Sequence, residues 1–254
     1  MRFLAIRNAS TVFNNIFYRS NFTSAKSKFL PVTHVIFDMD GVLLDTENIH
    51  KKAVSEVVAS FGKDYSQDLR YRVLGAPQLD GAKLVVDELK LPTSVSDFIQ
   101  MINKIEKKLL PNVDVLPGVE RLLRHLHSHN VPFAIATSSS KESFEIKTRK
   151  HKDLFSLFHH VVTGASDLEV KQGKPAPDIF LICASRFSDQ PHPNKCLVFE
   201  DSPNGVRGAV TAGMQVVMLP DPVIPKNLCT EATVVVDSMN DFLPEPFGIP
   251  AFKT

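Results

Sequence analysis

The 254-residue sequence lacks the features that would point to a membrane, a disulfide framework or a nucleic acid. No stretch approaches about eighteen consecutive apolar residues, so no transmembrane helix is expected. The three cysteines, Cys183, Cys196 and Cys229, form no C-x-x-C pair, which favours reduced, structural thiols in an intracellular protein. A formal net charge of +1 creates no broad basic surface. We therefore expect neither a nucleic acid polymer nor a membrane as a partner, and we expect a monomer.

The beginning of the chain also lacks acidic residues, and the first one in the sequence is Asp38. Residues 1–31 instead combine arginines and lysines with many Ser, Thr and Asn residues and with apolar residues at helical spacing. This composition is typical of a mitochondrial presequence, whereas a secretory signal would have a continuous apolar centre. We predict that residues 1–31 are an N-terminal extension with a mitochondrial address. A disordered extension of a cytoplasmic protein is the alternative.

The first apolar segment after this extension, residues 32–37, ends directly in Asp38-Met-Asp40-Gly41. A short run rich in β-branched and aromatic residues is typical of a buried parallel strand, and such strands deliver functional groups to their carboxyl ends. Two carboxylates one residue apart repel each other unless a cation lies between them or one is protonated. The segment therefore predicts a Mg²⁺ site, an acid–base pair, or both.

Residues 46–115 have a helical pattern. Apolar residues recur at helical spacing from Ile49 to Phe61, and Gly62 ends that helix. Further helices are expected at residues 80–89 and 95–110, and no strand is expected between residues 46 and 112. We predict an all-helical cap at residues 46–115. Because both of its ends return to the same place, the cap would lie over the two carboxylates.

Strands and helices alternate after residue 116. Strands are expected at residues 131–136, 160–163, 195–200, 215–219 and 233–236, and helices at 119–130, 144–158, 176–187, 205–212 and 238–243. This alternation implies right-handed crossovers and a mostly parallel sheet that is covered on both faces. We therefore predict an α/β protein whose Rossmann-like core comprises residues 32–45 and 116–254.

Polar segments follow three more of the predicted strands. Thr137-Ser138-Ser139 offers hydroxyls and successive backbone N–H groups, which suit an anion such as phosphate. An ordinary helix cap is the alternative interpretation. Lys174 precedes a Pro-x-Pro segment, from which it can pair with phosphate and with carboxylates, although a single lysine is more often exposed.

Glu200-Asp201 is the second acidic pair at the end of a predicted strand. It can complete an oxygen-rich Mg²⁺ shell, and the alternative is that Asp201 or Ser202 caps the next helix. Parallel strands end at one edge of their sheet, so all four polar segments are expected to meet there. Capping alone does not explain four such segments in this order.

The order of these motifs resembles that of the haloacid dehalogenase superfamily of phosphotransferases. The resemblance covers about residues 32–240, with a helical cap between the first and second motifs. It rests on four motifs: Asp38-Met-Asp40-Gly41, Thr137, Lys174 and Glu200-Asp201. It implies a phosphatase that acts on a small phosphorylated metabolite, either nucleotide-like or a sugar phosphate.

The resemblance also implies a role for each motif residue. Asp38 would be the nucleophile and would form an aspartyl phosphate, and Asp40 would be the general acid and base. Phosphate would be bound by Thr137, Ser138, Ser139 and Lys174. Mg²⁺ would be held by Asp38, the backbone carbonyl of Asp40 and Asp201, with Glu200 nearby. The cap would recognise the leaving group.

Two features of the sequence leave open a sugar-phosphate mutase and a different leaving group. His50 lies where related sugar-phosphate mutases carry a histidine, although an exposed residue of a helix is the favoured interpretation. The cap segment from Leu74 to Gln78 lacks the basic residues that relatives often have there, so contacts with the leaving group are expected to differ. A catalytically idle binding protein is disfavoured, because every motif position keeps a residue type that is competent for catalysis.

Overall fold

The computed structural model describes residues 29–73 and 78–253. Residues 1–28, which make up most of the predicted N-terminal extension, lie outside the described residues, as does most of the segment from Leu74 to Gln78. A six-stranded parallel sheet forms the core, in the order β3-β2-β1-β4-β5-β6. Its strands are β1 (His34–Phe37), β2 (Phe133–Thr137), β3 (Val161–Thr163), β4 (Cys196–Glu200), β5 (Gln215–Met218) and β6 (Val234–Val235).

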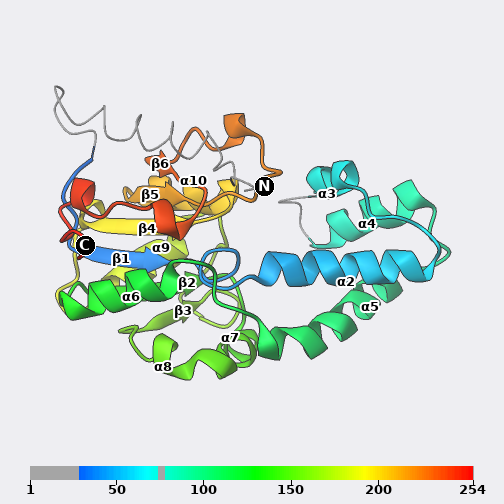
Figure 1. Cartoon of the computed structure of the whole chain (residues 1–254), viewed down its shortest axis with the longest axis horizontal. Coiled ribbons are helices and arrows are strands. Elements are labelled where there is room, and N and C mark those ends of the chain that lie inside the picture. The colour runs from blue at the N-terminus through cyan, green and yellow to red at the C-terminus, as the bar shows by residue number, and fades with distance from the viewer. Residues whose placement is uncertain (1–28, 74–77, 254) are drawn as a thin grey trace, which may run out of the picture.

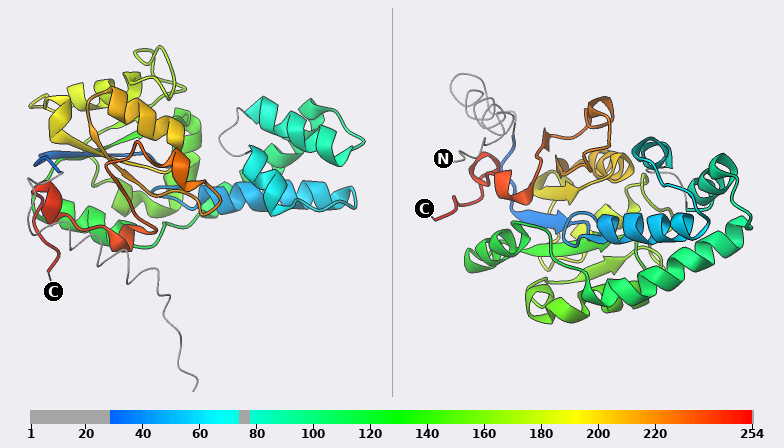
Figure 2. Two further views of the ribbon diagram at one scale, coloured as in Figure 1. Left: turned by 90° about the horizontal axis from the view of Figure 1, so that it is seen from above. Right: turned by 45° about the vertical axis from the view of Figure 1, so that its right-hand side comes forward.

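Helices cover both faces of the sheet (Figure 2). Alternate residues of each strand point to opposite faces, as a pleated strand requires. On one face the rings of Phe37 and Phe199 stack, with their centroids 4.8 Å apart. Both pack with residues of α6 (Val119–Ser128), α8 (Lys152–Phe155) and the C-terminal segment. On the other face Ile36 and its neighbours pack against α9 (Asp178–Ser185) and α10 (Pro203–Thr211). The sheet is therefore buried on both sides, and its open part is the edge where the strands end.

An all-helical insertion lies between β1 and β2 and projects from that end of the core (Figure 1). Its helices are α2 (Thr46–Ser60), α3 (Gln67–Val73), α4 (Gln78–Leu89) and α5 (Val95–Leu109). They enclose a separate apolar core that includes Val58, Phe98 and Ile102. No helix in the described part of the chain has the length and apolarity needed to cross a membrane.

Two chain segments connect the insertion to the core, and they are hydrogen-bonded to each other. The Asp45 N–H donates to the Asp114 carbonyl at 2.9 Å, and the Leu116 N–H donates to the Leu43 carbonyl at 3.0 Å. The short helical turns η1 (Leu110–Asn112) and η2 (Arg149–His151) lie beside this junction, next to α7 (Lys141–Thr148). The junction directly follows the Asp38-x-Asp40 turn, so the insertion begins beside the predicted site.

Candidate active site

The Asp38-x-Asp40-Gly41 turn leaves the buried end of β1. The Asp38 side chain is 8% exposed, and its backbone N–H donates to the Phe199 carbonyl at 2.9 Å. Gly41 has a φ of +78°, and a Cβ built on it would lie 2.2 Å from Oδ2 of Asp201. A side chain at Gly41 would therefore be strained and would also displace Asp201, so glycine allows the two acidic segments to approach each other.

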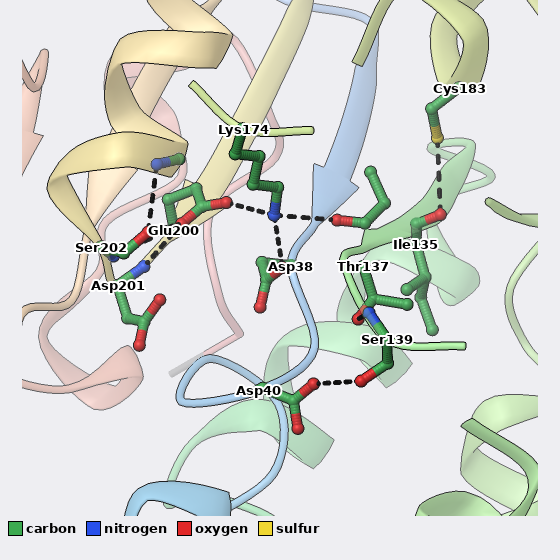
Figure 3. Close-up of polar contacts among 12 residues, drawn as sticks. Asp38, Asp40, Ile135, Thr137, Ser139, Lys174, Cys183, Glu200, Asp201 and Ser202 are labelled. Atoms are coloured by element: carbon green, nitrogen blue, oxygen red, sulfur yellow. Dashed lines mark hydrogen bonds and ion pairs between the residues drawn. The ribbon is translucent and has the colours of Figure 1, made fainter. Parts of the chain in front are cut away.

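Lys174 joins the first and fourth motifs (Figure 3). Its ammonium group donates to Asp38 Oδ1 at 2.5 Å, to Glu200 Oε1 at 2.6 Å and to the Ala136 carbonyl at 3.2 Å. All three charged side chains are at most 8% exposed. Buried charges are tolerated when they are paired and hydrogen-bonded, and this lysine uses all three of its donors.

Glu200 is fully buried, and both of its carboxylate oxygens accept hydrogen bonds. Oε1 accepts from Lys174, and Oε2 accepts from the Asp201 N–H and the Ser202 hydroxyl, both at 3.2 Å. Ser202 also caps α10, because its Oγ accepts from the Gly205 N–H at 3.0 Å. Glu200 is therefore tied to Lys174 and to the start of α10.

The carboxylates crowd together around a single ammonium group. Burial raises the pKa of Asp38 to about 7, against the opposing effect of Lys174. Burial, followed by the charges of Glu200 and Asp38, raises the pKa of Asp201. Burial disfavours the charge on Lys174, but Asp38 and Glu200 together hold its pKa above the usual value. A divalent cation would relieve the repulsion that remains among the acids.

The residues present suit a hard cation that keeps part of its water shell. Among the described residues, no three His, Cys, Asp or Glu side chains converge as a ready-made metal cage. However, Asp38 uses only Oδ1 in its bond to Lys174, and no described group donates a hydrogen bond to the Asp201 carboxylate. Mg²⁺ commonly binds through one or two carboxylates and several waters, so this pair of acids fits that ion.

Asp40 is held by different partners from those of Asp38. Its Oδ1 accepts from Lys147 at 2.7 Å, and its Oδ2 accepts from the Ser139 hydroxyl at 2.8 Å. Sequence reasoning missed Lys147, which is 8% exposed and lies on α7. The available signal was its spacing, because Lys147 follows Phe144 by three residues and so falls on the inward face of that helix.

The three residues of the predicted phosphate-binding segment, at the end of β2, lie in different surroundings. Thr137 is fully buried, and its Oγ1 accepts from the Ser139 N–H at 3.1 Å. Ser139 contacts Asp40 through its hydroxyl, as described above, whereas Ser138 is exposed and contacts none of the acidic residues. Ser140 caps α7 by accepting from the Ser143 N–H at 3.2 Å. The capping alternative therefore applies to Ser140, and the segment before it faces the site.

Two hollows share Glu47 as a lining residue, and one of them includes Asp201. A cavity of about 340 Å³ lies within the insertion and is lined by polar Glu47, His50 and Tyr65 as well as apolar residues. A wider cleft of about 660 Å³ includes Asp201 and also reaches Glu47. Burial raises the pKa of Glu47. Because Glu47 lines both hollows, it lies where the cleft at Asp201 adjoins the cavity in the insertion.

A family model described as haloacid dehalogenase-like hydrolase matches residues 35–219. The chain belongs to the haloacid dehalogenase-like hydrolase family. It is 49% identical over 221 residues to a "Probable pseudouridine-5'-phosphatase" of Drosophila melanogaster, with 87% of this chain and 96% of the relative covered. It is 46% identical to "(DL)-glycerol-3-phosphatase 1, mitochondrial" of Arabidopsis thaliana, with 87% of this chain and 75% of the relative covered.

Solved structures share the same architecture. A HAD family hydrolase from Deinococcus radiodurans R1, with bound phosphate and sodium, is 25% identical with a TM-score of 0.72, covering 85% of this chain and 95% of that one. A β-phosphoglucomutase from Clostridium difficile is 23% identical with a TM-score of 0.63, covering 85% and 97%, and this likeness concerns the fold alone. The predicted family and α/β fold class are confirmed, and the chain is a phosphomonoester hydrolase.

Proposed function

We propose that this hydrolase is a Mg²⁺-dependent phosphatase that acts through an aspartyl phosphate on Asp38. The observation that carries the proposal is the buried cluster at the strand ends, in which Lys174 joins Asp38 and Glu200 while the Asp201 carboxylate keeps its oxygens free. A nucleophilic carboxylate, a fixed ammonium and a free acid at one point are the parts that in-line phosphoryl transfer requires.

The reaction has two balanced steps. A carboxylate oxygen of Asp38 forms a bond to phosphorus as the bond from phosphorus to the alcohol oxygen breaks, and Asp40 gives its proton to that departing oxygen. Water then attacks the aspartyl phosphate and gives a proton back to Asp40, and the bond between Asp38 and phosphorus breaks to release phosphate. The same carboxyl group thus acts first as an acid and then as a base.

Mg²⁺ would be held by Asp38, the backbone carbonyl of Asp40 and Asp201, and would offset the charge of the phosphoryl group during transfer. We assign Glu200 to the fixation of Lys174 instead of the metal shell, because both of its oxygens already accept hydrogen bonds. Lys174, Thr137 and the backbone N–H groups of Ser138 and Ser139 are the proposed ligands of the remaining phosphate oxygens. To bind phosphate, the Ser139 N–H would leave Thr137 Oγ1, and one donor of Lys174 would leave the Ala136 carbonyl.

The leaving group would enter the cavity of about 340 Å³ in the insertion. That volume lies at the lower end of the range of about 300 to 1,000 Å³ that small-molecule pockets span. Glu47, His50 and Tyr65 offer polar partners for hydroxyl and base edges, and Phe98 lines the same cavity. Together with the similarity to the Drosophila relative, this favours pseudouridine 5'-phosphate as the substrate.

The test is phosphate release by the full chain, with and without Mg²⁺, from pseudouridine 5'-phosphate, uridine 5'-phosphate, glycerol 3-phosphate and hexose phosphates. We expect Mg²⁺-dependent hydrolysis that is fastest with the first compound, and Asp38→Asn should remove at least about 10³-fold of kcat without loss of the fold. Equal activity in the presence of a chelator would contradict the metal, and an active, folded Asp38→Asn variant would contradict the nucleophile. Preference for glycerol 3-phosphate or a hexose phosphate would overturn only the assignment of pseudouridine 5'-phosphate as the substrate.

A sugar-phosphate mutase of the same family is the second candidate, favoured by His50 in the cavity wall. A mutase would interconvert sugar phosphates without net phosphate release and would require a bisphosphate activator, so the same assay separates the two functions.

The proposed location is the mitochondrion, with the cytoplasm as the alternative. It is supported by the basic, acid-free composition of residues 1–31 and by the Arabidopsis relative whose name includes that compartment. A fusion of residues 1–31 to a fluorescent reporter tests the proposal, and a diffuse cytosolic signal would contradict it.

A further inference from the structure

Lys147 is a buried cation that the chemistry above does not use. It is 8% exposed, and its ammonium group has two hydrogen-bond partners among the described residues: Asp40 Oδ1 at 2.7 Å and Ser139 Oγ at 2.9 Å. Ser139 Oγ in turn donates to Asp40 Oδ2 at 2.8 Å. The three side chains form a closed ring in which both carboxylate oxygens of Asp40 are occupied.

The two partners of Asp40 differ in what they can do. An ammonium group only donates hydrogen bonds, so Oδ1 beside Lys147 must remain an acceptor. A serine hydroxyl both donates and accepts, so Ser139 can face Oδ2 whether or not that oxygen carries a proton. The ring therefore holds both carboxylate oxygens of Asp40, Oδ1 directly through Lys147 and Oδ2 through Ser139, which Lys147 also contacts.

We propose that Lys147 is a positioning residue that, together with Ser139, fixes the side chain of Asp40 in the orientation from which it protonates the departing alcohol. This inference rests on the proposed role of Asp40 as the general acid. The position of Lys147 in the chain supports it, because the helix that carries Lys147 continues into η2, where His151 Nε2 hydrogen-bonds the Val113 carbonyl at 2.7 Å beside the insertion. Asp40 is thus held against a helix that is itself fixed to the rim of the site.

A purely structural lysine would have a different signature. If Lys147 only neutralised the partly exposed Asp40, its loss would lower the unfolding temperature and slow the reaction of every substrate alike. A residue that positions a general acid matters most where the leaving group needs a proton. Alkyl phosphates release a basic alkoxide and need that proton, whereas 4-nitrophenyl phosphate releases a stable phenolate and hardly needs it.

The experiment compares kcat/KM of Lys147→Met for two substrates: the alkyl phosphate that the unsubstituted chain hydrolyses fastest, and 4-nitrophenyl phosphate. The ratio kcat/KM is the proper measure because it covers the steps up to alcohol departure and excludes hydrolysis of the aspartyl phosphate. We expect a loss of about 10- to 100-fold with the alkyl phosphate and less than about threefold with 4-nitrophenyl phosphate. Lys147→Arg, which keeps charge and donors, should restore most of the activity toward the alkyl phosphate.

The matched control is Lys152→Met on α8. The Lys152 side chain is exposed and has no hydrogen bond or ion pair among the described residues, so this variant should leave both kcat/KM values unchanged. Thermal unfolding would establish that each variant is folded. If Lys147→Met fails to fold, Lys147→Gln serves instead, because its shorter side chain is expected to give the same selective loss. Equal losses on both substrates, or a lowered unfolding temperature with kcat/KM unchanged, would overturn the proposal.

Asp40→Asn separates this inference from the proposed function. Asp40→Asn should show the same selectivity with a larger loss, and adding Lys147→Met to it should change kcat/KM by less than about twofold, because residues that act as one unit are not additive. If Asp40→Asn lacks the selectivity, the general-acid assignment fails and the role of Lys147 fails with it. If Asp40→Asn has the selectivity and Lys147→Met does not, only the role of Lys147 is overturned.

Discussion

Gly205 shows how strongly a single residue can determine the geometry of this site. It lies in the first turn of α10, and a Cβ built on it would be 1.9 Å from Cδ of Glu200. Glu200 is fully buried and bonded at both oxygens, so it has no free space into which it can move. Glycine at this position allows the helix to begin directly against the carboxylate that holds Lys174.

Gly205→Ala should therefore impair activity although Gly205 contacts no reacting atom. The added methyl group would push Glu200 away from Lys174, and we expect kcat/KM to fall by at least about tenfold and the free energy of unfolding to fall by about 1 to 3 kcal/mol, as in other overpacked sites. Steady-state kinetics and urea unfolding measure the two effects. Gly173→Ala is the control, because nothing lies within 4 Å of a Cβ built there. A Gly205→Ala variant with unchanged kinetics would mean that the position of Glu200 is not critical.

Sequence reasoning identified the residues of this cluster that follow strands. Asp38 and Glu200 come directly after or at the end of apolar β-branched runs, and the carboxyl edge of a parallel sheet brings such positions together. Lys147 has only a weak signal, its spacing from Phe144, because a lysine within a helix is ordinarily exposed; its tertiary contacts show that it belongs to the site. The free and occupied oxygens of the acids are likewise visible only in three dimensions.

At the scale of elements, long periodic segments were predicted well and short ones were not. The helix expected at residues 95–110 is α5 (Val95–Leu109), whereas α3 was missed because it buries only Leu69 and so has no repeating apolar face. The single helix expected at residues 144–158 is instead α7, η2 and α8 in succession. The last strand, β6, has only two residues, because an edge strand needs little pairing to close the sheet.

Two of the longer helices, α2 and α5, are linked by His50 and Glu106, whose Nδ1 and Oε1 atoms are 2.6 Å apart. The hydrogen bond to Glu106 is the main cause of a raised pKa of His50. A raised pKa means that the folded state favours the protonated ring. The pair therefore stabilises the fold fully below the ordinary value of 6.5, and the contribution disappears as pH rises through the raised pKa.

His50→Gln should consequently destabilise the protein in acid and hardly at all in alkali. Because the His50 side chain is 48% exposed, solvent screens the pair, and we expect a loss of only about 0.5 kcal/mol at pH 5.5. Urea unfolding of both proteins at pH 5.5 and pH 9 gives the difference. Glu106→Gln should reproduce the same pH dependence, since it removes the partner. An equal loss at both pH values would show that His50 acts through packing and not through its charge.

At the scale of the whole molecule, an ion pair joins the insertion to the core across the cleft. Arg70 on α3 donates to the Asp221 carboxylate in the segment after β5, and the two side chains are 12% and 15% exposed. Both residues line the cleft that also contains Asp201. The two linking segments and Ile49 of α2, which packs against the core, also connect the insertion to the core, and the ion pair adds a contact between α3 and the segment after β5.

Asp221→Asn should shift the insertion toward a more open arrangement. A partly buried ion pair that contributes about 1 kcal/mol changes such an equilibrium about fivefold, and because substrate must be enclosed between the two parts, we expect KM to rise by about three- to tenfold with a smaller change in kcat. Hydrogen exchange in α3 should accelerate as well, since its contact with the core is lost. Asp237→Asn makes the same change of charge in the same cleft at an exposed carboxylate without a hydrogen-bond partner among the described residues, so it should leave both measurements unchanged. If Asp221→Asn raised KM while hydrogen exchange in α3 stayed the same, Asp221 would act on the substrate through its charge. The ion pair would then not be needed to hold α3 against the core.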